Sequence, residues 1–317
     1  MKLWFAALAF SFCGASLGKP NIVGFDLARG GQFSINEGAA LTELRAAILH
    51  AFPNATFRGI STLTAEGLAG ADVVILSSAK GPTSAITPLT APDETSALRN
   101  FRDAGYGAII FADNDSFAGA ESLTANYMLT LPYGISATGT GPAWERAAIV
   151  TDPHSSPVTE GPFGSVQHFS VGWSGWFVGG PEILPTLATL ADNAMPVLRV
   201  WPRGWGESSS SYPQPNGAAV LFADSTMIND GYLTPENKAI VLNALAYVAG
   251  PGCPGDLNSD AMVDDADFQI FVAGYNVLDC MDPSMTVDCP ADFDADGFVD
   301  DTDFVVFVLA YNELICP

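Results

Sequence analysis

The chain has 317 residues, with 12 Lys and Arg against 35 Asp and Glu and a formal net charge of −23. This length allows a large hydrophobic core and favours two domains. Residues 253–317 hold 15 of the acidic side chains and no Lys or Arg, so the negative charge is concentrated at one end. Such a balance argues against a nucleic-acid partner, because few cationic side chains are present to neutralise phosphates.

Residues 1–18 have the pattern of a signal peptide. Lys2 supplies the positive end, an apolar run follows over residues 3–12, and small residues then lead to a predicted cleavage near Gly18. The run is too short to span a bilayer, and no later apolar stretch is long enough. We therefore expect an exported protein without a membrane span, either secreted or located in the periplasm or at the cell surface.

Residues 20–250 alternate between predicted strands and predicted helices. The strands are expected at 21–27, 56–60, 71–77, 107–112 and 217–225, and the helices at 36–51, 93–104 and 234–248. Asn36 is expected to cap the first of these helices, and Pro235 suits the first turn of the last. Strands that alternate with helices predict an α/β domain with a parallel sheet.

This larger domain resembles the class I glutamine amidotransferase-like fold, which has a flavodoxin-like sheet. Its closing segment, with Ala223-Asp-Ser225, Asn237 and Asn243-Ala-Leu-Ala-Tyr247, is similar to the end of DUF4350-type members. The resemblance implies a nucleophilic Cys on the turn after a central strand. That turn reads Ala112-Asp-Asn-Asp-Ser116, and residues 14–252 contain no Cys, so thiol catalysis of the family type is excluded. A shared fold does not carry function.

Other candidates for chemistry lie on predicted loops. Gly172-Trp-Ser-Gly175 lacks the spacing of a nucleophile elbow and is interpreted as a turn, and Ser225 is expected to cap the turn after its strand. His50 ends a helix and is interpreted as a surface residue. A metal or acid–base cluster could form from Asp152, His154, Glu160 and His168, with loop hydrogen bonding as the alternative.

Carboxylates and aromatic residues of the larger domain leave a carbohydrate-related role open. Asp113, Asp115 and Asp224 could gather at the carboxyl ends of strands and supply a pair for glycoside hydrolysis. The aromatic residues of the Gly- and Pro-rich segments suit sugar stacking, with core packing as the alternative. They are Trp173, Trp176, Phe177, Trp201, Trp205 and Tyr212.

The C-terminal region contains a duplicated acidic pattern. Oxygen side chains at positions 1, 3, 5, 9 and 12 and a backbone carbonyl at position 7 are the ligand spacing of an EF-hand calcium loop. The first loop offers Asp256, Asn258, Asp260, Met262 (by its carbonyl), Asp264 and Asp267. The second, 36 residues later, offers Asp292, Asp294, Asp296, Phe298 (by its carbonyl), Asp300 and Asp303. Position 8, Val263 and Val299, is expected to face the core and link the loops.

Each loop leads into an apolar helix, predicted at 268–276 and 304–312, and neither loop has a helix before it. A pair of loop-plus-helix units with Asp at position 12 resembles the type I dockerin domain over residues 253–317. The resemblance implies a small α-helical module, two bound calcium ions and a cohesin-type partner. The first loop departs from the pattern, because Ala261 stands where the second has Gly297 in a positive-φ turn, so we expect weaker binding there.

Four cysteines remain after removal of the signal peptide, and an even count in an exported protein indicates two disulfides. Two pairings respect the duplication: Cys253–Cys280 with Cys289–Cys316, or Cys253–Cys316 with Cys280–Cys289. The second is favoured, because each loop should start near the helix end of the other repeat.

The sequence thus predicts an exported calcium-binding protein, in which a dockerin-like tail attaches an α/β domain without evident catalytic residues to an extracellular component. The alternative is a secreted carbohydrate-active hydrolase or accessory protein in polysaccharide breakdown. A third possibility is a calcium-stabilised tail without a partner.

Overall fold

The computed structural model describes most of the chain, and the described residues fall into two compact units. The α/β unit comprises 19–249 and the tail comprises 255–313, with gaps at 80–87, 118, 141–145, 152–155, 181–183, 204–216, 256, 258–262, 286–288 and 294–296. The predicted signal peptide and the predicted boundary at 250–252 lie outside the described residues. Among the described helices, none has the length and apolar character needed to cross a membrane.

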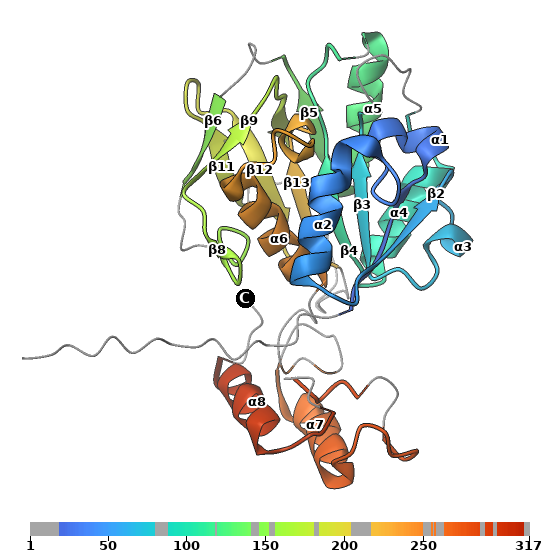
Figure 1. The fold of residues 1–317 in the computed structure, drawn as a ribbon, viewed down its shortest axis with the longest axis vertical. Coiled ribbons are helices and arrows are strands. Elements are labelled where there is room, and N and C mark those ends of the chain that lie inside the picture. Colours follow the sequence, from blue (N-terminus) through green and yellow to red (C-terminus); the bar gives the residue numbers. More distant parts are fainter. Residues whose placement is uncertain are drawn as a thin grey trace, which may run out of the picture. The chain divides into compact units, whose positions relative to one another are not determined.

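Five parallel strands form one half of a nine-stranded sheet (Figure 1). They are β1 (Asn21–Phe25), β2 (Thr56–Ile60), β3 (Val73–Ser77), β4 (Gly107–Phe111) and β13 (Ala219–Phe222). Every residue of β3 and β4 is buried, which explains why these strands read as continuous apolar runs. Their order, β2-β1-β3-β4-β13, matches the order of flavodoxin-like sheets. The five predicted parallel strands are confirmed.

The other half of the sheet is antiparallel and corrects the expectation of a purely parallel sheet. It continues from β13 through β12 (Pro196–Trp201), β11 (Thr186–Leu190), β6 (Arg146–Val150) and β9 (His168–Val171). Two small antiparallel pairs stand apart from it: β5 (Ile135–Thr138) with β10 (Trp176–Gly179), and β7 (Glu160–Gly161) with β8 (Gly164–Ser165). The large unit is therefore a mixed α/β fold.

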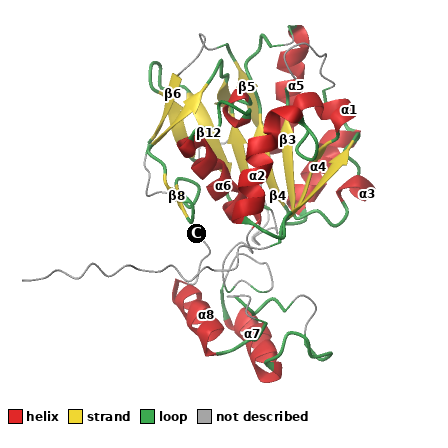
Figure 2. Cartoon of the chain, viewed as in Figure 1, coloured by secondary structure: helices red, strands yellow, loops and turns green. Residues whose placement is uncertain are grey.

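Helices cover both faces of the sheet (Figure 2). They are α1 (Leu27–Gly30), α2 (Thr42–Ala51), α3 (Ala65–Leu68), α4 (Asp93–Asp103), α5 (Ala120–Thr130) and α6 (Pro235–Ala249). Short 3-10 turns are η1 (Gly31–Phe33), η2 (Ala39–Leu41), η3 (Leu131–Tyr133) and η4 (Thr226–Ile228). Helices α2 and α6 pack side by side on one face. Right-handed crossovers place α4 on the opposite face, because β2 and β4 lie on opposite sides of the β1–β3 pair.

The start of α2 differs from the prediction. The helix begins at Thr42, so Asn36 does not cap it, and its flanking residue Leu41 provides no side-chain cap. Asp230 takes this role from far along the chain, because its carboxylate accepts hydrogen bonds from the N–H groups of Thr42 (3.1 Å) and Glu43 (2.8 Å). A tertiary contact thus replaces the local cap that the sequence indicated.

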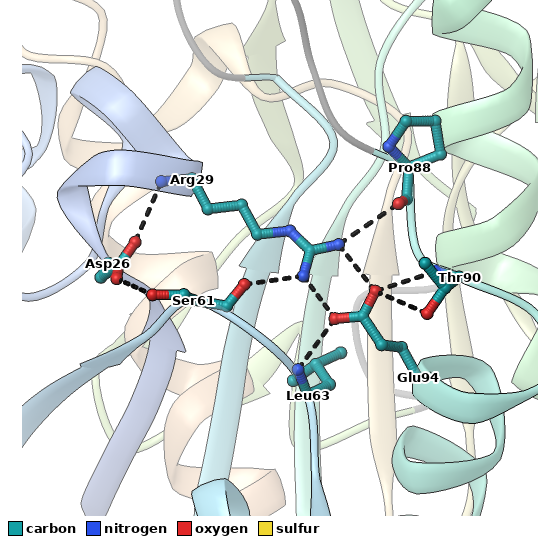
Figure 3. Close-up of polar contacts among 7 residues, drawn as sticks. All are labelled: Asp26, Arg29, Ser61, Leu63, Pro88, Thr90 and Glu94. Atoms are coloured by element: carbon teal, nitrogen blue, oxygen red, sulfur yellow. Dashed lines mark hydrogen bonds and ion pairs between the residues drawn. The ribbon is translucent and has the colours of Figure 1, made fainter.

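A buried ion pair holds the segment after β1 against α4 (Figure 3). Both terminal nitrogens of the Arg29 guanidinium contact the Glu94 carboxylate. That carboxylate also accepts from the N–H groups of Leu63 and Thr90, both at 2.9 Å. Burial opposes the charge, but Arg29 and these N–H groups still hold the pKa of Glu94 below its usual value. The network fixes the start of the segment that continues into η1.

The tail contains two helices, α7 (Asp265–Val277) and α8 (Asp301–Glu313), each beginning three residues before its prediction. The early start has a local cause in α7, where Asp264 and Asp267 form a capping box at the first turn. A small core of buried residues joins the two repeats: Val263, Phe271, Ala291, Val299 and Phe307. Val263 and Val299 lie in this core, as position 8 of each predicted loop requires.

Candidate functional site

The carboxylates at position 12 of the two tail loops have the same surroundings. Asp267 is fully buried and accepts from the N–H groups of Leu257 (2.7 Å) and Asp264 (3.0 Å). Asp303 is also fully buried and accepts from the N–H groups of the equivalent residues, Phe293 (2.6 Å) and Asp300 (2.9 Å). In each repeat the last acidic residue therefore folds back over the start of its loop.

The second loop also turns as its glycine predicts. The Asp292 carboxylate, at position 1, accepts from the N–H of Gly297 at 3.0 Å, and Gly297 has a φ of 95°. An L-residue with a Cβ is disfavoured at such a φ. The equivalent Ala261 lies outside the described residues, so the expected weakness of the first loop stays a prediction.

In the described part of the tail, the backbone of the second loop forms hydrogen bonds with the segment that follows α7. The N–H of Val299 donates to the carbonyl of Leu278 at 2.8 Å, and the N–H of Cys280 donates to the carbonyl of Gly297 at 3.0 Å. The segment after α7 is thus the backbone partner of the second loop in the described part of the tail. The side chain of Phe298 is half exposed.

Half of the predicted calcium ligands fall within the described residues. Asp264 and Asp300, at position 9, each accept from the N–H two residues on, at 2.8 and 2.7 Å, and so cap α7 and α8. Asp256, Asn258, Asp260, Met262, Asp294 and Asp296 lie outside them. The ligand set as a whole therefore stays a prediction.

One disulfide is present in the tail and joins Cys280 to Cys289, with a Cα–Cα separation of 5.5 Å. This bond belongs to the favoured pairing and excludes the alternative, in which Cys280 would bond to Cys253. The other two cysteines, Cys253 and Cys316, lie outside the described residues. The sulfurs lie near Asp292, but a disulfide leaves no thiolate there for a metal.

A second candidate site lies in the α/β unit, at the carboxyl ends of the parallel strands. A pocket of about 580 Å³ is lined by residues that follow β1, β3, β4 and β13. The strand order reverses between β1 and β3, and ligands of open α/β sheets bind at such a switch point. The lining consists of Gln32, Phe33, Ala79, Asp113, Asn114, Ser116, Phe117, Thr140, Trp173, Ser225, Thr226, Asn229 and Tyr232.

Asp113 is the charged group of this pocket. Its carboxylate accepts from the backbone N–H (2.7 Å) and side-chain amide (2.8 Å) of Asn114, and from the hydroxyl of Ser225. Burial raises the pKa of Asp113 to about 6, against the opposing effect of these donors. The hydroxyl of Ser225 therefore does not cap the turn after β13 as predicted, because it points to the carboxylate of the neighbouring strand end.

Asp224 has a structural role beside the pocket. Its carboxylate accepts from the N–H groups of Gly172 (2.7 Å) and Thr226 (2.8 Å) and so holds the β9–β10 loop against η4. Burial raises the pKa of Asp224 well above its usual value, and the charge of Asp113 raises it further. Two of the three carboxylates predicted to gather are thus close enough to interact. Only Asp113 lines the pocket.

The third carboxylate, Asp115, and the described members of the histidine cluster, Glu160 and His168, are not among the residues that line this pocket. The carboxylate of Asp115 accepts from the hydroxyl of Thr138 (2.8 Å) and the N–H of Gly139, which fixes the β5 end. Glu160 and His168 are exposed on β7 and β9, and Asp152 and His154 lie outside the described residues. His50 is exposed in the last turn of α2.

The aromatic residues divide between the pocket and the core. Trp173 lines the pocket, is 41% exposed and has a φ of 51°, which is unusual for a residue with a large side chain. Phe177 and Trp201 are buried, as the alternative of core packing predicted. Trp205 and Tyr212 lie outside the described residues.

Two buried asparagines near this site, Asn126 and Asn237, have positioning roles that the sequence did not predict. Asn126 of α5 fixes the turn after β4, because its side chain accepts from the N–H of Asp113 (3.0 Å) and donates to the Asp113 carbonyl (2.6 Å). Asn237, noted in the closing segment, bonds in the same way to both backbone groups of Ser170 and so positions β9. No local pattern marks either residue, because both helices carry several other polar side chains.

Comparisons with known proteins support the fold of the larger unit only. No family model matches the chain, and no curated protein matches it. Among solved structures, the N-terminal domain of mmIFT52 is similar over 72% of this chain and 96% of its own, with a TM-score of 0.51 and 15% identity. A putative ThuA-like protein from Bacteroides uniformis has a TM-score of 0.43, 14% identity and coverages of 74% and 92%.

A third similar structure is a putative GMP synthase component from Thermoplasma acidophilum, with a TM-score of 0.42, 12% identity and coverages of 73% and 94%. The last two structures have TM-scores below 0.5, and the similarity to the mmIFT52 domain, at 15% identity, shows the fold alone. Identities this low say nothing about activity. The dockerin resemblance continues to depend on the residues of the tail.

Proposed function

We propose that the tail binds two calcium ions and attaches the α/β unit to an extracellular partner of cohesin type. The observation that carries this proposal is the equivalence of Asp267 and Asp303. Both are fully buried, and both fold back onto positions 2 and 9 of their loops. Each repeat buries an aspartate at position 12 of its loop. This equivalence favours the same kind of ligand in both loops.

The charge of the tail favours a cation as that ligand. Residues 253–317 contain 15 acidic side chains and no Lys or Arg, so no cationic side chain of the tail can neutralise the buried pair. A buried carboxylate needs compensation by opposite charge or by hydrogen bonds, and a bound cation would supply the opposite charge. Several carboxylates in a twelve-residue loop fit calcium, a hard cation that takes six to eight oxygens.

Attachment to a partner would use surface that the tail leaves exposed. Phe268 and Phe304 occupy equivalent positions at the starts of α7 and α8, and each is 41% exposed although aromatic. Val305 beside the second is 58% exposed. Aromatic side chains at a protein surface are enriched in interfaces. The α/β unit would then be the part that the tail attaches to the partner. It lacks the nucleophilic Cys of the amidotransferase-like fold, which agrees with a role without thiol catalysis.

The test uses the full chain with and without calcium. Capture by an immobilised cohesin-type domain should occur with about 10 mM calcium, roughly tenfold or more above the Kd of extracellular modules, and should be lost in excess EDTA. Asp303→Asn should weaken capture. The matched control is Asp282→Asn, in an exposed turn between the repeats. Capture that persists in EDTA, or no capture at all, contradicts the proposal.

A further inference from the structure

The pocket at the carboxyl ends of β1, β3, β4 and β13 is not explained by the tail. Its volume of about 580 Å³ lies within the range of small-molecule sites, roughly 300–1,000 Å³. Asp113 is buried, with 4% of its surface exposed, yet it lines the open space beside the hydroxyl of Ser225. A buried carboxylate at the carboxyl end of β4, facing a pocket, indicates a ligand with hydrogen-bond donors.

The chemistry of the lining restricts that ligand. None of the described residues that line the pocket is Lys, Arg or His, so none of them offers a cationic partner to a phosphate or a carboxylic acid. The polar groups besides Asp113 are neutral amides and hydroxyls, including Gln32, Asn114 and Asn229. Amides can both donate and accept, as sugar hydroxyls do.

Aromatic rings supply the other half of a sugar site. Trp173 and Tyr232 line the pocket and keep 41% and 39% of their surface exposed. An aromatic ring suits the C–H face of a sugar ring, while neighbouring polar groups bind its hydroxyls. Gly175 allows the loop that carries Trp173 to lie close to the backbone of Asp113, because a Cβ at position 175 would lie 2.7 Å from the carbonyl oxygen of Asp113.

A second hollow adjoins the first and extends the site. It has a volume of about 430 Å³, is lined by Ser170, Thr234 and Asn237 among others, and shares Thr226 and Tyr232 with the first. Tyr232 therefore lines both hollows. None of the described residues that line the second hollow is charged. A ligand of more than one ring would occupy both.

We propose that the α/β unit binds a short neutral oligosaccharide in these two hollows, with Tyr232 between the sugar rings and Asp113 accepting hydrogen bonds from hydroxyls. The site binds without hydrolysing, because hydrolysis requires two carboxylates that flank the scissile bond and Asp113 is the only carboxylate among the described lining residues. Binding by this unit and attachment by the tail are separate properties of the chain.

Saturation-transfer NMR on the full chain tests this proposal with five neutral disaccharides: cellobiose, xylobiose, mannobiose, lactose and maltose. At least one should give a transfer signal, and the bound disaccharide should stay intact. Tyr232→Ala and Asp113→Asn should each weaken binding at least tenfold, whereas Tyr232→Phe should retain it by keeping the ring. The matched control is Tyr127→Ala, since Tyr127 is 46% exposed on α5 and lies outside both hollows.

Four results would overturn the proposal. They are the absence of signal from every disaccharide, equal binding by Tyr232→Ala, cleavage of the disaccharide, and displacement by choline, which would assign the pocket to a cation. Glucose 6-phosphate should give no signal. The calcium variant Asp303→Asn should leave disaccharide binding unchanged, so a failure of the tail and a failure of this site are distinguishable.

Discussion

Asp113 and Ser225 are 112 residues apart in sequence, yet their side chains are in direct hydrogen-bond contact. Each was a candidate because it follows an apolar strand, and a shared sheet edge brings such residues together. What the sequence could not provide was the order of the strands, since β4 and β13 pair although a long stretch of chain separates them. The candidate residues were thus predictable, and their pairing was not.

The buried Asp113 predicts a specific dependence of stability on pH. Its pKa is raised from about 3.8 to about 6, so the folded state holds the proton more tightly and stability falls as pH rises through that range. Asp113→Asn removes this fall and should raise the free energy of unfolding above pH 6 by about 1–3 kcal/mol. Urea unfolding at pH 4 and pH 7.5 measures the difference.

The same comparison has a clear contrary outcome. Asp224 remains in the variant and still has a raised pKa from burial, so some dependence should persist. A larger loss of stability for Asp113→Asn at pH 7.5 than at pH 4 would mean that the carboxylate of Asp113 stabilises the fold in its charged form, and would contradict the prediction.

The turn residue at position 6 predicts unequal calcium sites. Gly297 adopts a φ of 95° in the second loop, whereas the first loop has Ala261 at that position. Strain there costs about 1 kcal/mol, or roughly a fivefold loss of affinity. Calcium titrations of Asp256→Ala and Asp292→Ala should therefore show tighter binding by the former, which keeps the second site. Ala261→Gly should reduce the gap, and equal affinities would contradict the prediction.

At the scale of elements, the N-terminus of α2 depends on a distant side chain. The carboxylate of Asp230 accepts from Thr42 and Glu43, and loss of such a cap costs about 1 kcal/mol. Asp230→Ala should lower the free energy of unfolding by about that amount, measured by urea denaturation. Asn36→Ala is the matched comparison, since Asn36 lies outside the helix. If Asn36→Ala lowered the free energy of unfolding more than Asp230→Ala did, the result would contradict the role of Asp230 and favour Asn36 as the cap of α2.

The contact between the segment after β1 and α4 depends on Arg29 and Glu94. Because the pKa of Glu94 is lowered, its stabilisation is present above about pH 4.5 and is lost as pH falls further. Glu94→Gln leaves Arg29 buried without its charge partner and should destabilise the fold by about 3 kcal/mol at pH 7. Thermal unfolding at pH 7 and pH 3.5 checks this, and the variant should differ less from wild type at pH 3.5.

Elements were predictable where one interaction dominates. Buried parallel strands such as β3 and β4 are continuous apolar runs, and α6 has Pro235 at its start. The antiparallel strands β6, β9, β11 and β12 were missed, although their lengths of 5, 4, 5 and 6 residues are similar to those of the parallel strands. Segments rich in Gly and Pro separate them in the sequence. Their pairing is set by neighbours across the sheet, which no local pattern records.

For the whole molecule, the two units differ in what their sequences reveal. The tail is a repeat, so the equivalence of Asp267 and Asp303 and of Val263 and Val299 was visible before the structure. The α/β unit has no repeat, and its pocket gathers residues that follow β1, β3, β4 and β13 with Thr140 after β5 and Trp173 after β9. A carbohydrate site in the unit and calcium-dependent attachment by the tail would together hold the protein near extracellular polysaccharide.

Calcium stoichiometry tests the central proposal most directly. Isothermal titration calorimetry of calcium into the full chain, first freed of metal with EDTA, should give two ions per chain, and one ion for each of Asp267→Asn and Asp303→Asn. The Asp282→Asn control should retain two. The absence of binding heat, or a stoichiometry that neither substitution at position 12 lowers, would contradict the assignment of these loops as calcium sites.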